Sequence, residues 1–185
     1  APHRADRQHP AFNKLFIQTE ALSDLEALLA YRRPRSPEEP SIFVGHRLTF
    51  DRDSDHRFEF ETDRRHFVGR GGTMERPLRT TGRLSGSQGY VLDPILSLRR
   101  TVRLRPLERL QFSMVLAAGE SRERVQGLLE KYRDPAAIDQ AMELAWAAAQ
   151  LELRLLRIQP DEARRFQQLA SHLLYPNAAL RPPAD

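Results

Sequence analysis

Cysteine is absent from this chain of 185 residues. Its absence excludes disulfides and thiolate metal sites, and it fits a reducing compartment. Long apolar runs are missing too, because Glu143, Glu152 and Arg154 interrupt the most apolar segment and leave no stretch long enough to span a membrane. The polar start at residues 1–10 does not resemble a signal peptide. These absences predict a cytoplasmic location.

Lysine is scarce, since Lys14 and Lys131 are the only lysines in a chain with a formal net charge of +4. An arginine preference of this strength can follow from genome base composition, so basicity is weak support for nucleic-acid binding. A basic stripe would need Arg64-Arg65, Arg99-Arg100 and Arg103/Arg105, with aromatic residues between them. Few aromatics lie nearby. We therefore expect no nucleic-acid partner and rank a basic nucleic-acid-binding protein as the last hypothesis.

Short apolar segments separated by turn residues fill the first two thirds of the chain. We predict strands at residues 12–20, 27–33, 41–50, 58–62, 95–104 and 109–118. The second of these also suits a helix. Polar or glycine- and proline-rich turns lie at residues 21–24, 34–40, 51–57, 69–72 and 86–89. Because no helix is expected between the strands, we predict that residues 1–118 form an antiparallel β-sandwich or part of one.

Helices follow from residue 119 onward. Ser121 can cap a helix over 122–133, and Asp134-Pro135 starts a longer helix that runs to residue 158. Pro160 starts a third helix, which ends at Tyr175-Pro176. The long helix and the third helix have broad apolar faces with little chain left to cover them. We therefore expect this chain to be part of a larger protein or to form a homo-oligomer.

Four local motifs do not make a catalytic or metal site. Asp51-Arg-Asp-Ser-Asp55 has the opening spacing of a calcium loop but lacks the glycine and glutamate that the loop requires later. The six histidines are scattered, and we expect no metal ligand among them. Ser85 and Ser87 lie between glycines without a strand-to-helix elbow, which argues against a serine nucleophile. Gly69–Gly72 does not lead into a helix, so it is more typical of a connecting loop than of an anion cradle.

Four blocks of sequence, in the right order, together resemble one family: FNKLFIQTE at 12–20, FETDRRHFVGRGGT at 60–73, LSGSQGYVLDPILSLRRTVRL at 84–104 and FQQLASHLLYP at 166–176. They are similar to the phosphorylase module of cyclic β-1,2-glucan synthases, in glycoside hydrolase family 94 (glycosyltransferase family 36). The cellobiose and chitobiose phosphorylases are relatives. The resemblance covers nearly the whole chain.

The resemblance implies a galactose-mutarotase-like supersandwich over residues 1–118, a helical linker over 119–158 and the start of an (α/α)6 barrel over 159–185. The fold class is then α+β. Inorganic phosphate would be a co-substrate of the parent enzyme, which would lie in an inner-membrane protein with this module on the cytoplasmic side. The family's catalytic and phosphate-binding residues lie in the barrel, so none is expected in this segment.

One site residue follows from the resemblance. Phe67–Arg70 matches a Phe-x-Gly-Arg motif on a sandwich loop near the sugar pocket of related phosphorylases, which makes Arg70 the candidate for carbohydrate binding. The sequence departs from the family at Leu107, where a glycine usually follows the proline, and at the turn over 51–57. The resemblance implies a non-catalytic segment whose partners are the barrel of the same polypeptide and a β-linked glucan. A carbohydrate-binding module that acts alone through sheet-face aromatics and Arg99/Arg100 is the alternative.

Overall fold

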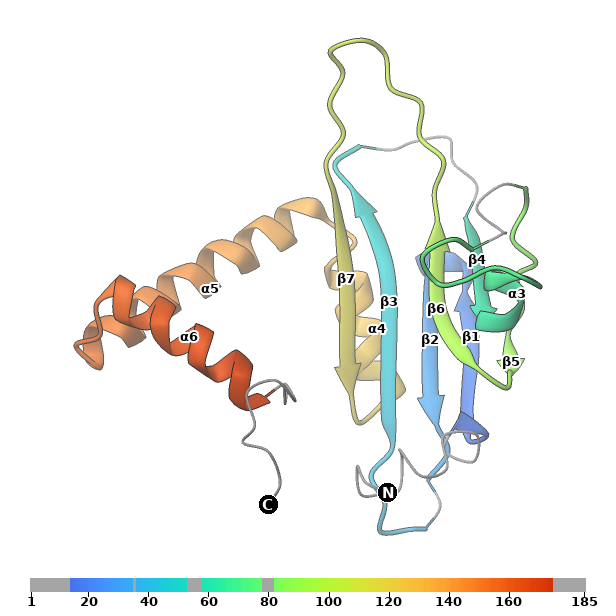
Figure 1. Cartoon of the computed structure of the whole chain (residues 1–185), viewed down its shortest axis with the longest axis horizontal. Helices are drawn as coiled ribbons and strands as arrows, with labels where there is room; N and C mark the ends of the chain where they lie inside the picture. The colour runs from blue at the N-terminus through green and yellow to red at the C-terminus, as the bar shows by residue number, and fades with distance from the viewer. Residues whose placement is uncertain (1–13, 35, 53–57, 78–81, 175–185) are drawn as a thin grey trace, which may run out of the picture. The chain divides into compact units, whose positions relative to one another are not determined.

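The computed structural model describes residues 14–34, 36–52, 58–77 and 82–174 (Figure 1). The chain divides into two compact units, Ala1–Ile138 and Asp139–Asp185. Within the described ranges, all strands belong to the first unit. Antiparallel sheets followed by helices confirm the expected α+β class.

The larger sheet has five antiparallel strands in the order β5-β1-β2-β3-β7. Their bounds are β5 (Gly89–Tyr90), β1 (Ile17–Leu22), β2 (Ala27–Arg32), β3 (Ile42–Phe50) and β7 (Phe112–Gly119). A short 3-10 helix, η1 (Ser23–Leu25), joins β1 to β2. Strand β3 pairs with β2 from Ala27↔Arg47 to Arg32↔Ile42, and with β7 along its other edge.

One face of this sheet carries the hydrophobic core. Successive side chains on a strand alternate between the two faces, so the paired residues Leu29, Gly45 and Ala117 lie on the same face. Helix α4 (Arg122–Lys131) packs on this face (Figure 1). Its residues Val125 and Leu129 are completely buried. Its N-terminus is capped as expected, because the Ser121 hydroxyl accepts a hydrogen bond from the Arg124 N–H at 3.2 Å.

A two-stranded antiparallel ribbon covers part of the opposite face. It consists of β4 (Glu59–Asp63) and β6 (Pro94–Arg99), and β6 contacts β1, β2 and β3. Thr19 and Leu28, whose side chains lie on the face opposite α4, are buried there. On β7 the same face is exposed, since the side chains of Phe112, Met114 and Leu116 are all more than half accessible to solvent.

Two helices follow the sheet. Helix α5 (Pro135–Leu155) begins at the expected proline, and Asp134 Oδ1 accepts a hydrogen bond from the Ala136 N–H at 2.9 Å. Helix α6 (Pro160–Leu174) begins at Pro160. Its large apolar side chains are exposed, from 54% for Phe166 to 84% for Leu173. No helix in the described part of the chain is long and apolar enough to cross a membrane.

Several predicted boundaries were wrong. Residues 14–16 are not a strand; β1 begins at Ile17 and continues through Leu22, into the expected turn, because it pairs with β2 over its full length. Strand β6 ends at Arg99, so residues 101–104 are irregular, and β7 begins at Phe112. A short helix, α3 (Arg64–Val68), interrupts the series of strands where no helix was predicted. The start of the first predicted strand and most of the 51–57 turn lie outside the described residues.

The turn at Arg105–Glu108 contains Leu107, where the chain departs from the family pattern. The Glu108 N–H donates to the Arg105 carbonyl at 3.0 Å, which closes a four-residue turn with Pro106 in second position. Leu107, in third position, has φ 64° and a fully exposed side chain. A turn with proline second and positive φ third ordinarily carries glycine at the third position, because a Cβ is disfavoured there.

We expect Leu107→Gly to stabilise the protein by about 1 kcal/mol, because glycine removes the left-handed backbone penalty. The midpoint of thermal unfolding should then rise by about 3 °C. Leu107→Ala is the matched control: it also removes the exposed apolar side chain but keeps the Cβ, and it should leave the midpoint nearly unchanged. Equal shifts for the two variants would mean that the side chain, and not the backbone, sets the stability of this turn.

Candidate functional site

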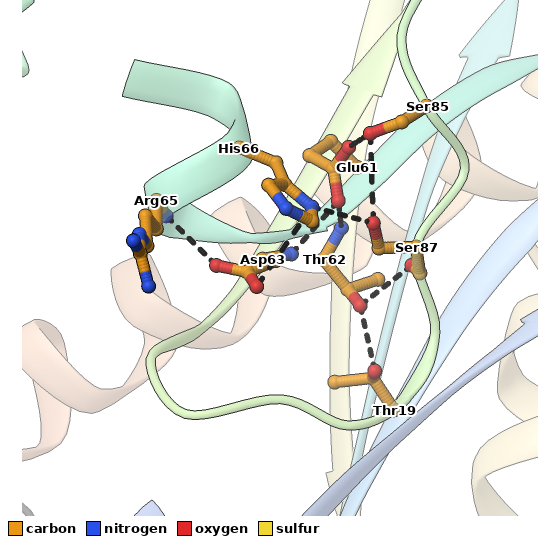
Figure 2. A network of polar contacts seen from close by, with 8 residues as sticks. All are labelled: Thr19, Glu61, Thr62, Asp63, Arg65, His66, Ser85 and Ser87. Atoms are coloured by element: carbon orange, nitrogen blue, oxygen red, sulfur yellow. Dashed lines mark hydrogen bonds and ion pairs between the residues drawn. The ribbon is translucent and has the colours of Figure 1, made fainter. Parts of the chain in front are cut away.

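The loop that carries Arg70 follows helix α3, and α3 is held in place by a network of polar contacts with β4 and residues 85–89 (Figure 2). The network begins in β4, where Glu61 and Thr62 are almost completely buried. Strand β4 is paired only on the β6 side within the described residues, so its other side is free to contact the segment around Ser85 and Ser87. This arrangement fixes the end of β4 from which α3 begins.

Glu61 is the anchor of the network. One carboxylate oxygen, Oε1, accepts hydrogen bonds from the N–H groups of Thr62 and Asp63, each at 3.0 Å. The other, Oε2, accepts from the Ser85 hydroxyl (Figure 2). Burial raises the pKa of the Glu61 carboxyl, but the hydrogen bonds from Ser85, Asp63, Ser87 and Thr62 together outweigh it and lower the pKa from its usual value. Glu61 is therefore held as a carboxylate at neutral pH.

Thr62 joins this network to the five-stranded sheet. Its hydroxyl donates to the Ser87 carbonyl at 2.7 Å, so its oxygen accepts from the Thr19 hydroxyl, also at 2.7 Å. The Thr19 oxygen also lies 3.2 Å from the Gly89 carbonyl. Both threonine side chains are buried. Buried hydroxyls of this kind need partners, and these contacts supply them across three separate segments of the chain.

Helix α3 is short, and it is held by a side-chain cap at its N-terminus, by His66 and by a backbone hydrogen bond at its C-terminus. The Asp63 carboxylate accepts from the Arg65 N–H at 2.8 Å and caps the N-terminus. His66 Nδ1 lies 3.0 Å from the Ser87 hydroxyl oxygen and ties the helix to the loop. At the C-terminus, the Gly69 N–H donates to the Arg65 carbonyl at 3.0 Å. Asp63 was the local signal for this helix, and the sequence reasoning missed it.

Arg70 lies on the loop that leaves α3. Gly69 and Gly71 on either side have φ of 76° and 86°, a backbone conformation that disfavours residues with a Cβ. The Gly72 N–H donates to the Gly69 carbonyl at 3.3 Å and closes the turn. Arg70 is exposed, and its guanidinium has no hydrogen-bond or ion-pair partner among the residues that the structure describes. The loop thus presents a positively charged donor to solvent.

The polar network is not a catalytic triad, although Ser87, His66 and Asp63 lie together. His66 uses the same nitrogen, Nδ1, toward the Ser87 hydroxyl at 3.0 Å and toward Asp63 Oδ2 at 3.8 Å. A relay needs the serine and the carboxylate on opposite ring nitrogens. This geometry does not supply Ser87 with the general base of a triad. The described residues also hold no group of three or more His, Asp or Glu side chains arranged to bind a metal ion.

Three of the six arginines that a basic stripe would need are paired with carboxylates. Arg64 lies 3.5 Å from Asp93, which also pairs with Lys14 at 2.5 Å. Arg99 pairs with Glu59, and Arg100 pairs with Glu26. These pairs neutralise much of the charge that a nucleic-acid or sugar ligand would meet on this surface. Most of the calcium-like motif lies outside the described residues; Asp51 accepts a hydrogen bond from the Gln111 N–H at 3.1 Å.

The profile of a family described as "Glycosyl hydrolase 94, supersandwich domain" matches residues 1–135. The chain belongs to this family. The match takes in every strand described above and the Arg70 loop, and it ends at Pro135, the first residue of α5. The resemblance drawn from the four sequence blocks is confirmed.

A relative gives the context of this supersandwich domain. The chain is 36% identical over 183 residues to "Cyclic beta-(1,2)-glucan synthase NdvB" of Rhizobium meliloti (strain 1021). The aligned region covers 98% of this chain but only 6% of that protein. The chain therefore corresponds to a small segment of a much longer relative.

Proposed function

We propose that this chain is the non-catalytic supersandwich and linker segment of a carbohydrate-active enzyme related to cyclic β-1,2-glucan synthases. The segment acts as a scaffold for a helical catalytic domain and contributes the Arg70 loop to the carbohydrate-binding surface. The observation that carries this proposal is the exposed Arg70 on a glycine-flanked loop, whose guanidinium has no partner among the described residues. The network at Glu61 and Thr62 holds that loop to the sheet.

The helices after the sheet fit the same proposal. We assign residues 119–158 to a linker and residues 159–185 to the start of an (α/α)6 barrel. The exposed apolar side chains of α6, including Leu173 and Leu174, then pack against later helices of the same polypeptide. Inorganic phosphate is a co-substrate of the parent enzyme in this proposal. The module lies on the cytoplasmic side of an inner-membrane protein.

The first experiment separates a scaffold from an enzyme. The 185-residue chain is incubated with a β-1,2-gluco-oligosaccharide and inorganic phosphate, and release of glucose 1-phosphate is measured. We expect no turnover, because the described residues contain no catalytic constellation. Turnover by this chain would overturn the non-catalytic assignment. Tight binding of the oligosaccharide without turnover would favour the alternative, a carbohydrate-binding module that acts alone.

The role of the loop is tested by Arg70→Ala in the full-length protein that contains this segment. Losing a charged hydrogen-bond donor should lower kcat/KM for the glucan by about tenfold, with unchanged thermal stability. Arg124→Ala is the control, because Arg124 is an exposed arginine on α4, across the sheet from the β4–β6 ribbon. The same kcat/KM for both variants would remove Arg70 from the carbohydrate-binding surface.

A further inference from the structure

A second basic feature lies away from the Arg70 loop, at the end of the sheet where β2 begins. Strand β3 pairs with β2 only as far as Arg47↔Ala27, so Leu48–Phe50 run past the end of β2. A hollow of about 290 Å³ opens beside this overhang. It is lined by Glu26, Arg47, Leu48, Thr49, Phe50, Arg52, Arg100 and Arg133.

The lining of the hollow is strongly basic, with four arginines against one glutamate. Three of the arginines have carboxylate partners: Arg100 pairs with Glu26, Arg52 with Glu108 at 2.7 Å, and Arg133 with Glu130 at 3.9 Å. The Arg133–Glu130 ion pair is long, and the side chains of both residues are more than half exposed. This pair therefore restrains Arg133 only weakly. Arg47 has no carboxylate partner among the described residues.

Arg47 is the unusual member of this group, because its side chain is only 4% exposed. Its Nη1 donates to the Leu129 carbonyl at 3.2 Å, near the C-terminus of α4. Its Nε is buried and has no hydrogen-bond partner among the described residues. Burial lowers the pKa of the guanidinium, and the nearby charge of Arg133 lowers it further, while Glu26 and Glu130 oppose the shift. A buried charged donor without an acceptor is costly.

A purely structural role accounts for only part of this arrangement. The last carbonyls of a helix need donors. The Arg47 guanidinium and the Thr49 hydroxyl supply two, to Leu129 and, at 2.7 Å, to Tyr132. That role would be complete with Nη1 alone. It does not explain why the buried Nε has no acceptor among the described residues.

We propose that this hollow binds a small oxyanion of the phosphate kind, held by the guanidinium groups of Arg47 and Arg133. Planar guanidinium donors match phosphate oxygens in geometry and charge. Three of the lining arginines are paired with glutamates, so the positive charge left over is that of Arg47, and it favours an anion. The volume of the hollow is several times that of one water molecule, so a tetrahedral phosphate group fits inside it. The ligand is then inorganic phosphate or the phosphoryl group of a small phosphomonoester.

The test uses the 185-residue chain and measures its thermal unfolding midpoint, and its binding by calorimetry, at constant ionic strength. Inorganic phosphate and glycerol phosphate are compared with chloride. A ligand that binds only the folded state raises the midpoint, so we expect a phosphate-dependent rise that chloride does not give. Tighter binding of glycerol phosphate would identify a phosphomonoester as the ligand, whereas equal or weaker binding would identify free phosphate.

Two variants and a control make the test specific. Arg133→Gln removes an exposed lining arginine, so the protein should fold normally and bind phosphate about tenfold more weakly. Arg47→Lys keeps the charge but removes the planar guanidinium, with both Nε and the Nη1 that donates to Leu129, and should weaken binding by a similar factor if it folds. Arg124→Gln removes the same charge from the other end of α4 and should bind like the wild type. No phosphate-specific binding, or equal weakening by Arg124→Gln and Arg133→Gln, would overturn the proposal.

Discussion

Replacing Gly45 with valine should separate α4 from the sheet and destabilise the protein by about 3 kcal/mol. A Cβ at Gly45 would lie 2.7 Å from both Leu129 Cδ1 and Val125 Cγ1, well inside van der Waals contact. Both side chains are completely buried, so neither can move without opening the core. The midpoint of thermal unfolding should fall by roughly 10 °C.

Glycine replacement on the facing helix provides the control. Gly127 lies in α4, and a Cβ at this position would have no neighbour within 4 Å. Gly127→Ala should therefore raise stability by up to about 1 kcal/mol through helix propensity. A double variant, Gly45→Ala with Leu129→Val, should lose less stability than the sum of its single variants, because the smaller side chain relieves the clash. Strict additivity, or a Gly45→Val protein as stable as the wild type, would contradict this packing.

Replacing Glu61 with alanine should cost about 3 kcal/mol, because two backbone N–H groups and the Ser85 hydroxyl lose their acceptor in a buried site. Glu61→Gln should cost much less, since the amide keeps an oxygen for the N–H groups and can donate to Ser85. Glu75→Ala is a suitable control, because it removes a carboxylate from an exposed position. The three variants are compared by chemical unfolding at pH 7.

The pH dependence of unfolding tests the charge of Glu61 separately. The folded protein lowers the pKa of this carboxyl from its usual 4.5. Ionised Glu61 therefore stabilises the fold fully above the unfolded-state pKa, and this contribution is lost as the pH falls through the folded-state pKa. The stability difference between wild type and Glu61→Gln should shrink as the pH falls below about 4.5. A difference that is constant from pH 7 to pH 3 would mean that folding does not shift the pKa of Glu61.

The network around Glu61 should also affect the position of the Arg70 loop. Asp63 directly follows Glu61 and Thr62 and caps α3, the helix that leads into this loop. If Glu61 positions the Arg70 loop as proposed, Glu61→Ala and Arg70→Ala should impair the same property of the full-length enzyme. Glu61→Ala should also lower stability, whereas Arg70→Ala should not, since the Arg70 guanidinium has no described partner. This contrast distinguishes a positioning residue from one that contacts the carbohydrate.

The sequence by itself determined the features that depend on neighbouring residues. Alternation of apolar side chains predicted β3 closely, and Asp134-Pro135 and Pro160 predicted where α5 and α6 begin, because capping and proline restraints act within one turn. Four ordered blocks were enough to predict the family. The sequence marked Leu107 only as a departure from the family's glycine, and the positive φ of this residue came from the structure.

Only the tertiary structure decided which distant residues meet. The pairing of β4 with β6 across some forty residues, the burial of Glu61 and the contact of Gly45 with α4 depend on long-range packing that no local pattern encodes. The arginines show this most clearly. In the sequence Arg47 and Arg99-Arg100 are similar charges, but the fold pairs Arg99 and Arg100 with carboxylates and buries Arg47 beside a hollow. Burial and partners, which come from the fold, determine what each charge can bind.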